Sequence, residues 1–184
     1  MNTKDFNEIY LNYAVYKNSK GEEYLVKVMG GYFASDAWQK GDSEYSNVVG
    51  SKFGGLFGDD GQVSHCNKYS IRRLTSLEEF EKLYADSCLL FKVMLKAFEA
   101  LYKVHAQHRK EFEEQGIPTK ITNEDGTCKF TSAGLQLIYE YQEIEEFEMC
   151  GSRWLQNIDK MKDEDWFIGL AEFLFKDCKR KANK

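Results

Sequence analysis

The chain has 184 residues, of which 42% are hydrophobic and 15% aromatic, and its formal net charge is −5 at pH 7. This length fits one domain with a sizeable core, and the many aromatic residues together with a single proline exclude a disordered chain or a proline-rich spacer. The longest apolar run, Trp166 to Ala171, is far shorter than the roughly 18 residues that a transmembrane helix needs.

The cysteines and the start of the chain bear on its compartment. The five cysteines are widely spread and form no C-x-x-C pair, which argues against a disulfide framework and favours reduced thiols. The first residues contain no apolar signal region. We therefore expect a cytoplasmic protein.

The first half of the chain reads as a small sheet with a long insertion. Apolar side chains alternate with a period of two over residues 9–16 and 24–28, and turn residues at 18–21 lie between them, so we expect a β-hairpin. Residues 30–61 contain eight of the 14 glycines, interleaved with aromatic residues, and predict a long loop of the kind that is usually either functional or disordered. A short strand over 68–74 is expected to return to the sheet.

The second half reads as mainly helical. Ser76 and Glu79 have capping-box spacing, and apolar residues then recur at helical spacing to about Glu114, which predicts one central helix about 60 Å long, with a bend or break allowed near His105 to His108. Turn residues at 123–126 predict a small hairpin near 120–131. Helices are expected near 132–150, 152–162 and 164–180, with a break at Gly151, although the first also alternates as a strand would.

These patterns predict an α+β fold in a single domain over residues 1–184. A small N-terminal antiparallel sheet, made of the hairpin and the return strand, would pack on a helical C-terminal half with one long central helix. The β-rich part would cover residues 1–75, and the helical part residues 76–184.

The acidic residues are concentrated in one stretch of the chain. Ten acidic and three basic side chains lie between Glu140 and Glu172, a local charge of −7, whereas the remaining 22 basic and 20 acidic residues give about +2. On a helix Glu140, Glu143 and Glu146 would share one face. That face is either simply solvated or a docking strip for a basic partner.

A second candidate surface lies in the glycine-rich segment. Residues 50–61 look superficially like a phosphate loop but lack the G-x-x-x-x-G-K-[ST] pattern. The segment is either a flexible surface loop or a recognition loop in which Phe53, Leu56 and Phe57 bury against a partner, since aromatic anchors often dominate interfaces.

Catalytic and cofactor signals are weak. His105, His108 and Glu111 follow one another on one helix face, but zinc usually needs four ligands and the H-E-x-x-H spacing is absent. Arg72, Arg73 and the basic tail over 176–184 are small clusters of the kind that a nucleic-acid-binding protein uses. We assign no catalytic residue, no metal and no cofactor.

The sequence therefore favours a non-enzymatic protein-binding module. Its partner would be a basic, nucleic-acid-binding protein, and one version is a phage or mobile-element inhibitor of a host defence enzyme, similar in action to an anti-CRISPR protein. Two alternatives stay open: a metal-dependent enzyme using His105, His108 and Glu111, and a nucleic-acid-binding accessory protein. No membrane association is expected.

Overall fold

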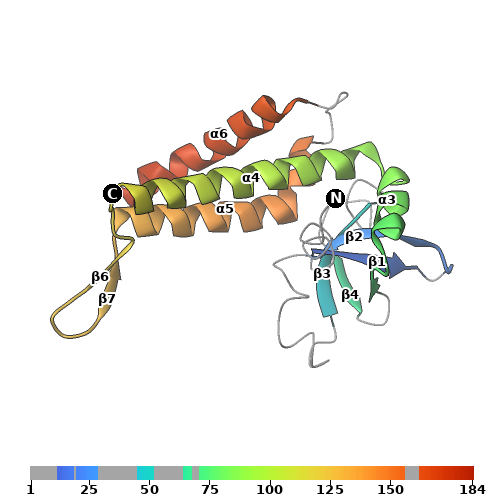
Figure 1. Cartoon of the computed structure of the whole chain (residues 1–184), viewed down its shortest axis with the longest axis horizontal. Helices are drawn as coiled ribbons and strands as arrows, with labels where there is room; N and C mark the ends of the chain where they lie inside the picture. Colours follow the sequence, from blue (N-terminus) through green and yellow to red (C-terminus); the bar gives the residue numbers. More distant parts are fainter. Residues whose placement is uncertain (1–11, 19, 29–44, 52–63, 68–70, 156–161) are drawn as a thin grey trace. The chain divides into compact units, whose positions relative to one another are not determined.

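The computed structural model describes residues 12–18, 20–28, 45–51, 64–67, 71–155 and 162–184, without the side chains of 45–50, 64–67 and 148–154. Within it the chain divides into two compact units, which we call unit 1 (Met1–Met94 and Glu148–Asp159) and unit 2 (Leu95–Phe147 and Lys160–Lys184). Strands dominate the N-terminal part and helices the C-terminal half, including one long helix, so the predicted α+β fold is confirmed (Figure 1).

The described strands and helices are, in chain order, β1 (Tyr13–Lys17), β2 (Glu23–Val28), β3 (Tyr45–Gly50), β4 (Ser64–Asn67), β5 (Ile71–Arg73), α3 (Leu77–Ala85), α4 (Leu89–Glu114), β6 (Lys120–Thr122), β7 (Cys128–Phe130), α5 (Ser132–Leu155) and α6 (Glu164–Ala182).

Unit 1 contains a five-stranded antiparallel sheet with strand order β4-β3-β2-β1-β5. The predicted hairpin is β1 and β2, and its turn closes where Gly21 takes a φ of +82° and donates to the Asn18 carbonyl at 3.0 Å. The predicted return strand is β5, which pairs with β1. Apolar side chains of these strands form a small core of Ala14, Val26, Val28 and Ile71.

The long loop predicted over 30–61 is only partly tested, and in part it is wrong. Residues 45–50 form β3, which pairs with β2 and with β4. The prediction rested on glycine content, but Tyr45, Val48 and Val49 favour an extended chain once neighbouring strands supply hydrogen-bond partners. Residues 30–44 and 52–61 lie outside the described part of the chain.

The predicted forty-residue helix is two helices, because the chain breaks at Asp86–Cys88 rather than near His105. Ser76 caps α3 as expected, accepting from the Glu79 amide at 3.1 Å. At the other end the Ser87 hydroxyl donates to the Leu83 carbonyl at 2.9 Å. A serine side chain that bonds the preceding turn competes with the helix, and here α3 ends.

The helices of unit 2 also differ from the prediction at Gly151. α5 runs through this glycine to Leu155, so residues 132–150 and the start of the predicted 152–162 helix belong to one element. Residues 156–161 lie outside the described chain. α6 begins at the Asp163 cap, which accepts from the Trp166 amide at 2.9 Å, and ends in Lys179, Arg180 and Lys181, where cations favour the helix dipole.

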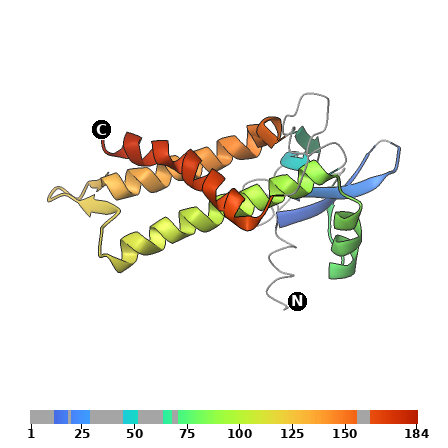
Figure 2. The same ribbon diagram turned by 90° about the horizontal axis from the view of Figure 1, so that it is seen from above.

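Within unit 2 the helices α4 and α5 run alongside each other, α6 crosses them obliquely, and the β6–β7 hairpin joins α4 to α5 (Figures 1 and 2). Their facing sides supply the core, which includes Phe98, Leu101, Val104, Ile144, Phe147, Phe167, Leu174 and Phe175. The Phe98 and Phe147 rings meet edge to face at 5.7 Å. Among the described residues, no helix is both long and apolar enough to cross a membrane.

Candidate functional site

A carboxylate lies completely buried among the helices of unit 2. The Glu140 side chain has no exposed surface, and its two oxygens accept three hydrogen bonds. His105 Nδ1 lies 3.0 Å from one oxygen, His108 Nδ1 lies 2.8 Å from the other, and Gln136 Nε2 donates to that second oxygen at 2.8 Å. We call these four residues the Glu140 cluster.

Helix geometry brings the cluster together. His105 and His108 are one turn apart on α4, and Gln136 and Glu140 are one turn apart on α5, so each pair projects from a single face. On α5 the buried positions Ala133, Gln136, Glu140, Ile144 and Phe147 recur every three or four residues. Glu140 therefore occupies a core position in this stripe.

The electrostatics of the cluster favour an ionised carboxylate. Burial acts to raise the pKa of Glu140, but the hydrogen bonds from His105, His108 and Gln136 together outweigh it and hold that pKa below its usual value. The bond to Glu140 raises the pKa of His108, against the opposing effect of burial. An ionised carboxylate only accepts hydrogen bonds, so each imidazole donates through Nδ1–H and its Nε2 points away from Glu140.

Side chains of α6 lie next to the Glu140 cluster. The His108 and Phe175 rings lie 6.3 Å apart. Cys178 is buried, and burial together with Glu143 and Glu140 raises the pKa of its thiol to about 11. Such a thiol stays protonated at neutral pH, so Cys178 has the character of a core residue and not of a nucleophile.

The three glutamates predicted to form one acidic face lie in three environments. Glu140 is buried in the core, Glu143 is half-buried and Glu146 is exposed. Burial and the neighbouring Glu146 raise the pKa of Glu143. Among the acids of this stretch of α5 whose side chains the structure describes, Glu145 and Glu146 are exposed, and Glu145 was not one of the three glutamates predicted to form the docking face.

The histidine pair does come together with a carboxylate, but that carboxylate is Glu140 and not Glu111. Glu111 instead accepts from Gln107 at 2.9 Å. Within the part of the chain that the structure describes, no group of three or more His, Cys, Asp or Glu side chains is placed to hold a metal ion. Nδ1 of both histidines is occupied by the bond to Glu140.

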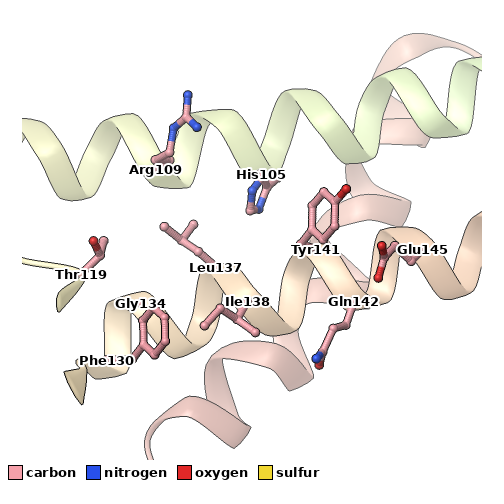
Figure 3. Close-up of a pocket in the computed structure, with 10 residues that line it drawn as sticks. All are labelled: His105, Arg109, Thr119, Phe130, Gly134, Leu137, Ile138, Tyr141, Gln142 and Glu145. Atoms are coloured by element: carbon pink, nitrogen blue, oxygen red, sulfur yellow. The ribbon is translucent and has the colours of Figure 1, made fainter. Parts of the chain in front are cut away.

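A groove of about 430 Å³ opens beside His105 within unit 2. Figure 3 shows His105 projecting from α4 toward α5, with the side chains of Tyr141 and Glu145 next to each other at one end. The full lining is His105, Arg109, Thr119, Phe130, Gly134, Leu137, Ile138, Tyr141, Gln142 and Glu145. Its volume falls within the range of about 300–1,000 Å³ typical of ligand sites.

Gly134 allows the base of the hairpin to close the other end of this groove. A Cβ built on Gly134 would lie 2.0 Å from the Thr119 carbonyl oxygen and 3.2 Å from the Phe130 ring. A side chain at this position would push the hairpin away from α5, so the glycine sets the shape of the groove.

The basic residues proposed for nucleic-acid binding are partly engaged within unit 1. Arg72 donates to Glu23 at 2.9 Å and to Glu79 at 2.7 Å. These two carboxylates more than balance its charge, which makes this place a poor phosphate site. The tail residues Lys179, Arg180 and Lys181 are exposed at the end of α6. Phe53, Leu56 and Phe57 of the predicted recognition loop lie outside the described residues.

No protein-family model matches this chain, and no curated protein or solved structure is similar to it at a significant level. The function must therefore be argued from the residues of this chain alone.

Proposed function

We propose that this protein is a non-catalytic module that binds a basic protein through the exposed acidic part of α5. The observation that supports the proposal is that Tyr141, Glu145 and Glu146 are exposed on α5 and that the first two of them line the groove. The side chain of Tyr141 is 43% exposed although its neighbours Glu140 and Ile144 are fully buried. An exposed aromatic residue beside carboxylates can bury against a partner while the acids attract its basic groups.

The charge of the chain supports a nucleic-acid-binding protein as the partner. The stretch from Glu140 to Glu172 carries a net charge of −7, and surfaces that bind nucleic acid are basic. Occupying such a surface would make this chain an inhibitor, as expected of a phage or mobile-element protein that acts against a host defence enzyme. Direct binding of nucleic acid by this chain would have to overcome the same negative charge.

The test is capture of a partner by tagged protein from a bacterial lysate, with nuclease treatment, at low and high salt. We expect one basic protein that survives nuclease and is released by salt, because charge attraction is screened over about 10 Å at 0.1 M salt. The double variant Glu145→Gln/Glu146→Gln should lose this protein. The matched double variant Asp165→Asn/Glu172→Gln on α6, which removes two exposed acids from the same acidic stretch, should keep it.

Three results would contradict the proposal. Equal loss of the partner in both double variants would mean that only total charge matters. Loss in Phe173→Ser, with retention in the α5 variant, would place the interface on α6, where the Phe173 side chain is 72% exposed. A shift of labelled single-stranded or duplex DNA by the purified protein at low salt would favour direct nucleic-acid binding, since phosphate contacts are strongest there.

A further inference from the structure

The floor of the groove is one apolar face of α5. Residues 134, 137, 138, 141, 142 and 145 recur every three or four positions and line it together with His105 and Arg109 from α4. Leu137 and Ile138 are half-buried and Tyr141 is exposed. A flat or elongated apolar group can therefore lie along α5 with its end at Tyr141 and Glu145 (Figure 3).

Two polar groups at the Tyr141 end of the groove, on Glu145 and His105, can accept hydrogen bonds. The Glu145 carboxylate lies one helical turn beyond Tyr141, and no ion pair or hydrogen bond within the described residues involves it. His105 gives its Nδ1–H to Glu140, so Nε2 is the remaining nitrogen of its ring and accepts a hydrogen bond when the ring is neutral. A ligand rich in N–H donors and carrying positive charge matches this set.

We propose that the groove receives an arginine side chain of the basic partner, an inference that rests on the function proposed above. The methylene stem lies over Leu137 and Ile138, and the guanidinium stacks on Tyr141 and donates to Glu145. A guanidinium fits better than an ammonium because it is planar, weakly hydrated and able to donate two parallel bonds to a carboxylate while it stacks on an aromatic ring.

Among the described residues that line the groove, Arg109 is the one Lys or Arg, and it lies at the other end. Arg109 Nε lies 4.0 Å from Glu113 Oε1, and both side chains are strongly exposed, so its charge is partly balanced along α4. Along α5, Glu145 lies eight residue steps beyond Leu137, which is about 12 Å at 1.5 Å per step. This length keeps an incoming guanidinium at Glu145 away from Arg109.

The test compares two probes of nearly equal size, N-acetyl-arginine amide and N-acetyl-citrulline amide, in which a charged guanidinium is replaced by a neutral urea group with fewer N–H donors. Binding is followed by the amide and side-chain NMR signals of isotope-labelled full-length protein. We expect saturable shifts at Tyr141, Gln142 and Glu145 with the arginine probe, and affinity on the order of tenfold weaker for citrulline, the combined effect of one stacked cation and one exposed ion pair.

Variants assign the effect to the groove. Tyr141→Leu and Glu145→Gln should each remove the preference for arginine, whereas Glu114→Gln, at an exposed acid paired with Lys110 on α4, should leave it unchanged. Equal affinity for both probes, or no shift with either up to the solubility limit, overturns the inference. So does an arginine preference that survives in Glu145→Gln.

Failure of the arginine site can be distinguished from failure of the proposed protein-binding function. If the captured basic protein is lost only in Glu146→Gln and is retained in Tyr141→Leu and Glu145→Gln, the protein-binding function stands and the arginine site fails. If no α5 variant affects capture, the proposed function itself fails.

Discussion

In each unit a charged side chain lies between two side chains that bind it. The two sites differ in how deeply these side chains are buried. In unit 1, Arg72 bridges Glu23 and Glu79, and the three side chains are 41%, 39% and 21% exposed. In unit 2, Glu140 lies between His105 and His108 with no exposed surface. The geometry is comparable, but water can replace the partners only in unit 1.

This difference decides what each arrangement contributes. Exposed ion pairs typically add at most about 1 kcal/mol, because water and salt compensate for their loss. A buried charge that loses a partner costs several times more, because nothing replaces the lost bonds. The pairs also respond differently to pH, since histidine titrates near neutrality and arginine does not.

The largest expected effect is the loss of the buried carboxylate. Glu140→Ala leaves the donors of His105, His108 and Gln136 without an acceptor and opens a gap in the core of unit 2. We expect a loss of about 3–5 kcal/mol in the free energy of unfolding, measured by urea titration with far-ultraviolet circular dichroism. Glu146→Ala, an exposed glutamate on the same helix, should change it by less than about 0.5 kcal/mol. Similar losses in both variants would contradict the buried role of Glu140.

The next largest expected effect is a dependence of the free energy of unfolding on pH. The pKa of Glu140 is lowered, so its stabilisation is present above the unfolded value of 4.5 and is lost as pH falls through the folded value. The pKa of His108 is raised, so its stabilisation is complete below the unfolded value of 6.5 and is lost as pH rises through the folded value. These two groups together stabilise the fold most between pH 4.5 and 6.5.

Urea titrations across the pH range check this window. Glu140→Gln should flatten both limbs of the stability profile, because glutamine does not ionise and His108 then loses the carboxylate to which it is hydrogen-bonded. A profile in Glu140→Gln that parallels the wild-type profile would assign the pH dependence to other groups.

A substitution in unit 1 is expected to cause a smaller loss in the free energy of unfolding. Arg72→Gln removes both ion pairs of the exposed arrangement and should cost less than about 1 kcal/mol at low salt. That cost should shrink at 1 M salt, where charges are screened within about 3 Å. Unfolding titrations at the two salt concentrations give the comparison, and a salt-independent loss as large as that of Glu140→Ala would remove the distinction between the two units.

The smallest expected effect is an increase, not a loss, in the free energy of unfolding. Burial and Glu146 raise the pKa of Glu143, so its charged form is unfavourable in the folded state. Glu143→Gln should therefore increase the free energy of unfolding at pH 7 by a few tenths of a kcal/mol. The gain should vanish below about pH 4.5, where this carboxyl is protonated in both states. A loss of stability at pH 7 would mean that the Glu143 carboxylate makes a favourable contact.

Local patterns predicted the elements that depend on near neighbours in the chain. Alternation and turn residues located the β1–β2 hairpin, and the Ser76 cap located the start of α3. The break at Asp86–Cys88 was missed because apolar spacing continues on both sides of it, and a helix-ending hydrogen bond from Ser87 leaves no periodic signal. β3 was missed because its stability comes from pairing with β2 and β4.

The environment of Glu140 was also missed, in part because it depends on residues that are distant in the chain. Glutamates three residues apart predict a solvated face, whereas Ala133, Gln136, Ile144 and Phe147 place Glu140 in the core stripe. That stripe was readable in the sequence and could have corrected the assignment. The partners were not readable, because His105 and His108 lie 35 and 32 residues away in the chain and are brought to Glu140 only by the packing of α4 on α5.

The most direct test of the buried Glu140 cluster is the tautomer of its two histidines, read from long-range nitrogen–proton NMR spectra of the imidazole rings. We expect that, when neutral, His105 and His108 both carry their proton on Nδ1, because an ionised Glu140 can only accept. Glu140→Gln should remove this shared preference. Protonation of both neutral rings on Nε2 in the wild-type protein would contradict the cluster and with it the contrast between the two units.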